Sequence, residues 1–237
     1  MNQTTSNIMM VRPANFGFNV QTAENNAFQS NDKSESDKAV AQKARDEFDT
    51  MVTTLRSYGV NIIVMEDTDS PVKPDAVFPN NWISFHEDGS VYTYPMFAPN
   101  RRIERREDII NSLKSDFNIT RRYTFEHYEE DDMFLEGTGS MLFDRINKYV
   151  YACLSDRTDA RILDKFCVLT SSNMIVFHSV DRNGDPIYHT NVMMGVAETF
   201  AIVCLDSIDD KKERKNLVNH LKLDSKEIIT ITEKQLY

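Results

Sequence analysis

The sequence of 237 residues predicts an α/β fold made of repeated units in the order strand, strand, helix, strand. Three observations predict this fold class. Apolar runs of strand length alternate with segments of helical periodicity, turn signals join pairs of strands into hairpins, and helices begin near residues 37, 100, 158 and 208. The units span about 50–60 residues each and share the order of their elements rather than residue identity.

The first unit opens on a short apolar strand, Asn7–Val11. Residues 14–36 are polar and rich in Asn and Ser, so we expect a long irregular loop, of a kind that often has a function. A helix is predicted over Asp37–Tyr58, because its apolar residues recur at helical spacing and Gly59 follows it. The continuous apolar run Val60–Met65 then predicts a buried strand.

Three further units follow the same pattern. In the second, strands Trp82–His86 and Val91–Tyr94 are joined by an Asp-Gly turn and precede a helix over Arg101–Phe117 and a strand over Ile119–Tyr123. The third and fourth are predicted to contain strands Met141–Asp144, Tyr149–Cys153, Asn173–His178, Asn191–Met194, Phe200–Cys204 and Ile228–Ile231, with helices at Thr158–Leu169 and after an N-cap at Ser207, three residues before Asp210.

Composition argues against several classes of function. The net charge of -10 disfavours a nucleic-acid partner. No apolar run approaches the ~18 residues of a membrane span, no signal peptide is visible, and the three cysteines lack paired spacing, so a cytoplasmic protein is expected. The five histidines form no metal-binding motif, so neither a metal nor a cofactor is expected.

His189 is the first candidate for chemistry. It lies between a turn at residues 181–186, with Asn-Gly and Asp-Pro signals, and the apolar end of Asn191–Met194. A histidine at the mouth of a strand, with its ring facing a pocket, suits general acid/base catalysis. A core or capping histidine is the alternative interpretation.

Five segments, in order along nearly the whole chain, resemble the motifs of the guanidine-modifying superfamily: Asp75–Trp82, Asn100–Glu104, Leu135–Ser140, Ser155–Thr158 and Tyr188–Asn191. That superfamily includes arginine deiminases, dimethylarginine dimethylaminohydrolases and glycine amidinotransferases. Within it, the sequence is most similar to the bacterial citrulline-utilisation hydrolase type, whose members are often labelled amidinotransferases.

The resemblance implies a pentein fold, an α/β propeller of five ββαβ units in a ring around a central active site. About four units are visible here, and the first lacks an obvious leading hairpin. We therefore expect one catalytic domain over residues 1–237 that lacks its last repeat. The ring would then be open beside the helix at 37–58, whose apolar face would be partly uncovered and would favour association with another chain.

The resemblance also implies roles for individual residues. His189 matches the general acid/base histidine, and Glu136 matches the carboxylate that orients this histidine or the substrate, so the two should meet across a central cleft. Asp75 and Asn81 match positions that hold the substrate's planar nitrogen group, and Phe78 is similar to a pocket wall. From local sequence alone, Asp75 also fits a turn residue, and Glu136 fits an acceptor of backbone N–H groups.

Arginines are expected to receive the substrate's α-carboxylate, which a guanidinium binds in a bidentate way. Arg157 resembles the arginine with this role. Either Arg101 or Arg102 resembles a second one, and the sequence does not decide which of them faces the pocket. A surface position is the alternative for Arg157. A pocket that is locally basic at its carboxylate end follows from these assignments, in spite of the acidic chain.

The mechanism that the resemblance implies is covalent. A cysteine thiolate attacks the central carbon, an amine or ammonia leaves with a proton from the histidine, and water hydrolyses the intermediate. The family's nucleophilic cysteine follows the last repeat, in a Gly-rich segment that is not found here. Cys167 and Cys204 are expected in the core. Cys153, four residues before Arg157, is the alternative nucleophile, but the chain alone is expected to be inactive.

The expected function is hydrolysis at the guanidino or ureido carbon of arginine, methylarginine or citrulline. An amidinotransferase, a non-catalytic ligand-binding member and an inactive truncated product are the alternatives. Asn81 favours citrulline, because a neutral amide suits a neutral ureido group where other branches often have a carboxylate. The expected partner is a small amino acid, with no nucleic acid and no membrane, and a homo-oligomer is compatible with the sequence.

Overall fold

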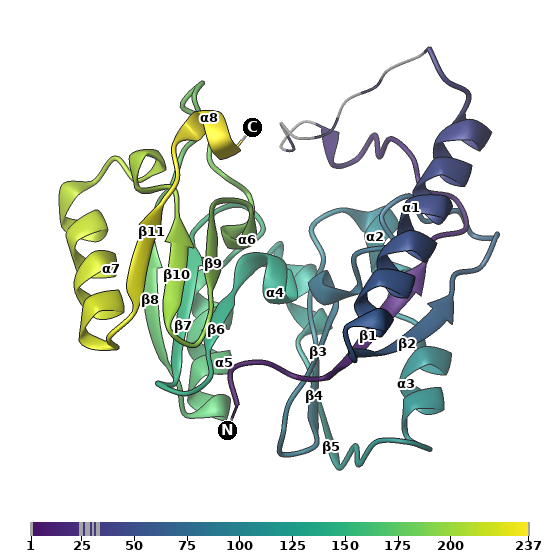
Figure 1. Ribbon diagram of the computed structural model, residues 1–237, viewed down its shortest axis with the longest axis horizontal. Coiled ribbons are helices and arrows are strands. Elements are labelled where there is room, and N and C mark those ends of the chain that lie inside the picture. Colours follow the sequence, from purple (N-terminus) through teal and green to yellow (C-terminus); the bar gives the residue numbers. More distant parts are fainter. Residues whose placement is uncertain (1, 24–25, 27–28, 30, 32–33, 237) are drawn as a thin grey trace.

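The computed structural model describes residues 2–23, 26, 29, 31 and 34–236. Four small sheets follow one another in chain order, and in each a helical segment connects two parallel strands (Figure 1). Two short helices, α4 (Gly137–Ser140) and α6 (Thr190–Met193), lie between the sheets near the middle of this view. The predicted α/β class with repeated units is confirmed.

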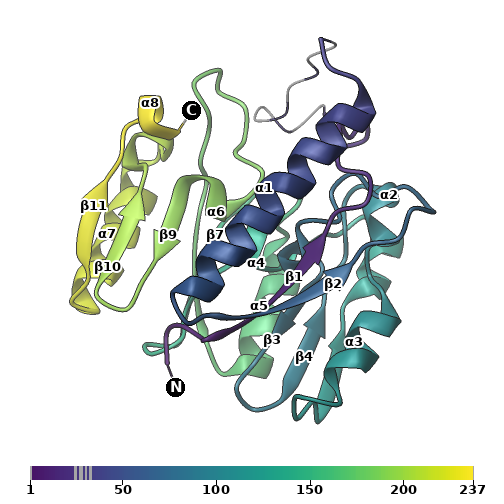
Figure 2. The ribbon, with the colours of Figure 1, turned by 45° about the vertical axis from the view of Figure 1, so that its right-hand side comes forward.

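The first unit has the order βαβ, with β1 (Asn7–Arg12), α1 (Asp37–Ser57) and β2 (Asn61–Glu66). Its two strands pair in parallel, which requires a crossover connection such as α1. Ser36 caps α1 by accepting a hydrogen bond from the Ala39 N–H. Figure 2 shows α1 alongside β1 and β2, and the helix contacts both strands. Phe48 is buried there, whereas Met51 is 54% exposed, so the apolar face of α1 is partly uncovered, as predicted.

The second unit contains η2 (Pro79–Asn81), β3 (Ile83–Phe85), β4 (Ser90–Thr93), α2 (Pro99–Arg102), α3 (Glu107–Leu113), β5 (Arg121–Thr124) and η3 (Glu126–Asp131). The prediction of one helix over residues 101–117 is wrong. The chain turns after α2, because the Glu104 N–H bonds to the Arg101 carbonyl (3.0 Å) and the buried Arg101 side chain binds the Glu104 carboxylate. Helix α3 then starts anew after Arg106.

The third and fourth units repeat the ββαβ order. They contain β6 (Leu142–Asp144), β7 (Tyr149–Cys153), α5 (Ala160–Thr170), β8 (Asn173–Phe177), then β9 (Met194–Val196), β10 (Phe200–Val203), η4 (Leu205–Ser207), α7 (Lys211–Leu223), β11 (Glu227–Thr230) and α8 (Glu233–Leu236). In each unit the first two strands are antiparallel, and the helix returns the chain to a parallel third strand.

Two predictions in the fourth unit are wrong. Residues 191–193 belong to the helical turn α6 rather than to a strand, and β9 begins only at Met194. Helix α7 is capped by Asp210, whose side chain accepts two backbone N–H groups of the first turn. Ser207 instead ends the 3-10 helix η4. Both residue types are good N-caps, so the choice between them depends on how the chain leaves β10.

Neighbouring units share their cores. One apolar cluster joins the third and fourth units and includes Tyr151 and Val203, and another joins the second and third units and includes Tyr92 and Phe166. These shared cores fix the sheets relative to one another, and hence the loops that lead into α4 and α6. In the described part of the chain, no helix is long and apolar enough to cross a membrane.

Candidate active site

His189 and Glu136 are in direct contact although 53 residues separate them in the sequence. His189 Nε2 lies 2.7 Å from Glu136 Oε2, and both side chains are buried. Each residue directly precedes a short helix, His189 before α6 and Glu136 before α4. The Thr190 hydroxyl donates to the Ser140 carbonyl (2.6 Å) and ties these two helices together. The predicted approach of the two side chains is confirmed.

The Glu136 carboxylate is surrounded by donors and positive charge. Its Oε1 accepts the Phe97 N–H (2.9 Å), and its Oε2 lies 3.5 Å from Arg157 Nη1 and 3.8 Å from Arg101 Nη1. Burial alone would raise the pKa of Glu136, but the hydrogen bond from His189 and the nearby charges, among them Arg157 and Arg101, lower it to about 2. Glu136 is therefore ionised at neutral pH and accepts the His189 hydrogen bond.

Burial lowers the pKa of His189 below its usual value, and the hydrogen bond to Glu136 only partly opposes this shift. The imidazole is therefore neutral at pH 7. Because Glu136 can only accept, Nε2 of His189 carries the proton and Nδ1 has the free lone pair. The pair thus presents a neutral base that is oriented by a buried carboxylate.

Gly139 allows His189 and Asn81 to lie side by side. A Cβ at this position would come within 2.5 Å of Asn81 Nδ2 and 2.7 Å of His189 Nδ1. Gly137 has a positive φ of 45°, and a Cβ there would lie 2.2 Å from the Asn80 carbonyl oxygen. The two glycines of α4 are therefore steric requirements of the site, a role that the sequence alone did not predict.

Arg101 is buried in a network of polar side chains. Its Nε and Nη2 bind the two oxygens of Glu104 at 2.9 Å each, its Nη1 donates to Asn81 Oδ1 (3.0 Å), and Asp75 Oδ2 lies 3.6 Å from Nε. Burial raises the pKa of Glu104 to about 7, against the opposing charge of Arg101. Sequence reasoning missed Glu104, because only the fold shows that it holds Arg101.

Of the two arginines between which the sequence did not decide, Arg101 lines the cavity described below, whereas Arg102 does not. Arg102 is half-buried and points to other partners: its Nε lies 3.1 Å from the Met96 carbonyl oxygen and 3.3 Å from Glu129 Oε2. The structure therefore does not bring Arg102 into the site.

The orientation of Asn81 follows from the chemistry of its neighbour. Arginine only donates hydrogen bonds, so the amide oxygen of Asn81 must face Arg101. Its Nδ2 is then directed away from Arg101, beside His189 Nδ1 over Gly139. Among the described residues, no acceptor binds Nδ2. The site thus offers an amide donor next to the histidine.

Asp75 is held by a residue of the N-terminal loop. Asn19 is fully buried; its Nδ2 donates to Asp75 Oδ2 (2.6 Å), and its Oδ1 accepts from Asn100 Nδ2 (2.7 Å). The described part of the predicted loop at 14–36 thus reaches the site. Sequence reasoning missed Asn19, since one asparagine in a polar loop has no distinguishing pattern.

Asp75, Asn81, Arg101 and His189 are among the residues that line a cavity of about 620 Å³, within the usual range for small-molecule sites. Arg157 is buried at one side, with its guanidinium carbon 4.6 Å from the centre of the Tyr188 ring and 5.7 Å from that of Phe97. Phe78, at 44% exposure, forms part of the wall. Of the eight residues predicted for the site, six line this cavity, Glu136 contacts His189, and Arg102 lies outside the site.

None of the three cysteines lines this cavity. Cys153, the alternative nucleophile, is fully buried in the core shared by the third and fourth units, with its Sγ 3.4 Å from the Ile187 carbonyl oxygen. Burial raises the pKa of the Cys153 thiol and raises that of Cys167 to about 12. Cys204 is fully buried too. All three positions suit core thiols better than a reactive thiolate.

No group of three or more His, Cys, Asp or Glu residues in the described ranges is arranged to hold a metal ion. The ionisable groups of the cavity pair with one another instead. Their arrangement can orient a planar polar group beside a neutral base, with two buried guanidinium groups close to Glu136.

Comparison with solved structures defines the class of protein. The chain is similar to the N-terminal domain of ArgZ, an arginine dihydrolase of the ornithine–ammonia cycle in cyanobacteria, bound to product, with a TM-score of 0.72 and 15% identity over 97% of this chain and 76% of that one. The match to a longer ArgZ chain covers 97% of this chain but only 30% of the ArgZ chain, at 14% identity and a TM-score of 0.68.

A dimethylarginine dimethylaminohydrolase from Pseudomonas aeruginosa, as a cysteine-to-serine mutant complexed with citrulline, is also similar, with a TM-score of 0.66 and 15% identity over 98% of this chain and 78% of that one. These likenesses show the α/β pentein fold of enzymes that modify guanidino groups. The model of the eukaryotic N,N-dimethylarginine dimethylhydrolase family matches residues 12–237, and the chain belongs to this family. No curated protein matched the sequence.

Proposed function

We propose that this protein is a C–N hydrolase that acts on the ureido or guanidino carbon of a small amino acid. The observation that carries the proposal is the buried contact of His189 with Glu136, 2.7 Å long, at a cavity that also contains Arg101 and Arg157. Membership of the N,N-dimethylarginine dimethylhydrolase family supports the same reaction class. The proposed single catalytic domain covers residues 1–237.

In this proposal the substrate's α-carboxylate binds Arg157, because a buried guanidinium stacked on Tyr188 is pre-oriented for a bidentate partner. Asp75 and Asn81 hold the planar group at the other end, and Phe78 covers the aliphatic chain. Arg101 is a positioning residue: its hydrogen bond to Asn81 Oδ1 fixes the orientation of the Asn81 amide, and Arg101 does not itself contact the substrate.

The orientation of Asn81 favours a ureido group over a guanidinium. A guanidinium presents only N–H donors, whereas a ureido group also presents a carbonyl oxygen. The Nδ2 donor of Asn81 can bind that oxygen and would oppose a guanidinium N–H. The buried Arg101 cation also disfavours a second cation nearby. Citrulline is therefore the proposed substrate among the three that the sequence left open.

His189 is the proposed proton carrier. As a neutral base it takes the proton that the attacking group loses when a bond forms to the ureido carbon. The resulting imidazolium is stabilised by Glu136 and returns the proton to the departing nitrogen as the C–N bond breaks. The thiolate of the family mechanism is not supplied by Cys153, Cys167 or Cys204 in these positions, so a thiol from another segment is required for the covalent step.

That placement of the cysteines favours a second candidate, a member that binds such an amino acid without turning it over. Calorimetric titration of the 237-residue chain with citrulline, arginine and N,N-dimethylarginine, together with an ammonia assay, tests both. We expect citrulline to bind tightest. Binding without ammonia release favours the binding protein, and failure of all three ligands to bind would refute both proposals.

The Asn81→Asp variant tests the choice of substrate. A carboxylate at this position can accept from a guanidinium, so the ratio of affinities should move toward arginine by about tenfold or more, the effect of one hydrogen bond to a charged group. Asn80→Asp is the matched control, since Asn80 lines the same cavity without bonding to Arg101. An unchanged ratio in Asn81→Asp would contradict the ureido preference.

A further inference from the structure

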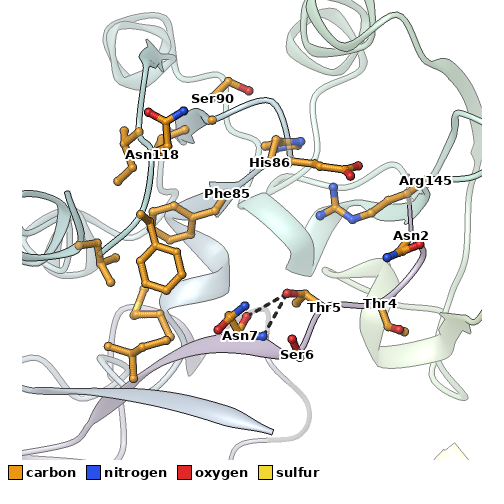
Figure 3. A pocket seen from close by; sticks show the side chains of 18 of the residues that line it. Asn2, Thr4, Thr5, Ser6, Asn7, Phe85, His86, Ser90, Asn118 and Arg145 are labelled. Carbon is orange, nitrogen blue, oxygen red and sulfur yellow. Dashed lines mark hydrogen bonds between the residues drawn. The ribbon is translucent and has the colours of Figure 1, made fainter. Parts of the chain in front are cut away.

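A second cavity, of about 510 Å³, lies apart from the candidate active site (Figure 3). Five separate parts of the chain form it, namely residues 2–9, Ile63 of β2, the β3–β4 turn region at 85–91, residues 113–119 and Arg145. None of its lining residues lines the first cavity. Nothing in the proposed reaction uses this space.

The walls of this second cavity are fixed by hydrogen bonds across the chain. Gln3 donates from Nε2 to the Phe143 carbonyl (2.7 Å) and accepts the Arg145 N–H at Oε1 (2.8 Å). This exchange ties the N-terminal segment to the third unit. On another side, a Cβ at Gly89 would lie 2.4 Å from the Asn118 carbonyl oxygen, so the β3–β4 turn packs directly on residue 118. The cavity is therefore a built feature of the fold.

Arg145 brings a positive charge into this space. Its guanidinium carbon stacks 4.9 Å from the centre of the Phe143 ring, and Figure 3 shows the guanidinium directed into the cavity. Burial lowers the pKa of Arg145. Among the described residues, no side chain or carbonyl accepts a hydrogen bond from its guanidinium, and no carboxylate forms an ion pair with it. Glu87 also lines this cavity, and its charge opposes the lowering of the Arg145 pKa.

The histidine in this cavity adds no charge at neutral pH. Burial and the nearby Arg145 lower the pKa of His86 to about 4, and its Nε2 is bound to the Ser84 hydroxyl (2.9 Å). A ligand would therefore meet the Arg145 guanidinium, which no carboxylate of the described residues contacts as an ion pair, a neutral imidazole ring and the nearby Glu87 carboxylate. Partial burial of a guanidinium without an acceptor costs free energy, and an anion that binds the guanidinium would offset this cost.

The opposite part of the wall is apolar. It consists of the side chains of Met9, Ile63, Phe85, Leu113, Phe117 and Ile119. Apolar walls with a small number of placed polar or charged groups are typical of sites for small ligands, and the volume lies in the range that such sites occupy. One guanidinium matches one carboxylate in charge and in shape.

We propose that this cavity is a second ligand site, which binds a small monocarboxylate with an apolar body. The carboxylate pairs with the Arg145 guanidinium, and the apolar body lies against Phe85 and Phe117. The ligand also joins the N-terminal segment to the β3–β4 turn and to the third unit, because all three contribute wall residues.

Titration of the full chain with 4-phenylbutanoate tests this proposal, with 4-phenylbutan-1-ol as the uncharged probe of the same shape. We expect one-to-one binding of the acid, about tenfold or more tighter than the alcohol. In Arg145→Met, which keeps an unbranched stem over Phe143, the acid should weaken to the level of the alcohol. Arg161→Met, at a side chain 72% exposed, is the matched control and should change neither affinity.

Equal affinity of acid and alcohol, or unchanged acid binding in Arg145→Met, would overturn the charge pairing, and so would no binding of the acid at millimolar concentration. Phe85→Ala should weaken both probes, and unchanged binding of both would move the apolar body elsewhere. A competition titration with citrulline separates the sites: displacement of the acid by citrulline would show that it occupies the active-site cavity and refute a second site. A circular dichroism melt of each variant confirms that it is folded.

Discussion

The two cavities of this molecule differ in whether their charged side chains are paired within the protein. In the first, every ionisable side chain has a partner within the protein: Arg101 with Glu104, and Glu136 with His189 and Arg157. In the second, the guanidinium of Arg145 stacks on a ring but has no anion in contact among the described residues. A ligand of the first cavity must fit polar atoms that are already oriented, whereas a ligand of the second must supply the missing charge itself.

The largest expected effect is the loss of stability when the charge balance of the first cavity is removed. Glu136→Gln leaves Arg101 and Arg157 buried without their common carboxylate, which should destabilise the protein by about 3–5 kcal/mol. Urea unfolding followed by circular dichroism measures this loss. Glu107→Gln, at a side chain 63% exposed beside Arg122, is the control and should change stability by less than about 0.5 kcal/mol. Similar losses in the two variants would mean that the cluster does not balance charge as described.

The next effect concerns ligand binding in the first cavity. Arg157→Ala should weaken binding of an α-carboxylate amino acid by about 2–5 kcal/mol, because one partner of a buried charge pair is lost. Calorimetric titration with citrulline gives the value, and Arg161→Ala, on the exposed face of α5, serves as control. If the affinity of Arg157→Ala equals that of the unmodified chain, the carboxylate binds elsewhere.

Acidification should weaken the same cluster. The pKa of Glu136 is lowered from 4.5 to about 2 in the folded chain. Below pH 4.5 the unfolded chain therefore binds a proton at this carboxyl that the folded chain does not bind. The free energy of unfolding then falls as the pH falls toward 2. That difference corresponds to about 3 kcal/mol. The pKa of His189 is also lowered, from 6.5, so its contribution has the same sign and begins below pH 6.5.

Unfolding free energies measured by urea titration between pH 7 and 3 test this pH dependence. The unmodified chain should lose more stability on acidification than Glu136→Gln, which has no carboxyl to protonate at that position. Parallel curves for the two proteins would show that the pKa of Glu136 is not lowered by its neighbours.

The sequence predicted the parts of the fold that have a clear local signal. Helix α1 has a regular apolar face and a stop at Gly59, and the hairpins have Asp-Gly or short polar turns, so these elements were predicted to within a few residues. The segment Asn191–Met194 was predicted as a strand, because four residues are too few to show whether their period is helical. The break between α2 and α3 depends on the Arg101–Glu104 ion pair, a tertiary feature.

The sequence predicted those site residues that lie in motifs of the resembled superfamily. It did not predict residues whose role is to hold another side chain in position. His189, Glu136 and Arg157 were placed by their motifs, and the structure brings them together. Asn19 and Glu104 were missed, since each acts by holding another side chain in place. Contacts of this kind join loops that are far apart in sequence, so local patterns do not reveal them.

The smallest expected effect completes the comparison of the two cavities. Arg145→Met removes a cation that has no ion-pair partner while keeping an apolar stem to pack on Phe143, so it should leave stability unchanged or raise it by up to about 1 kcal/mol. This result would have the opposite sign to that of Glu136→Gln. Urea unfolding at neutral pH and in the absence of any carboxylate buffer measures it. A loss of about 2 kcal/mol or more would show that the guanidinium is balanced inside the protein, and the second cavity would then have no unmatched charge to offer a ligand.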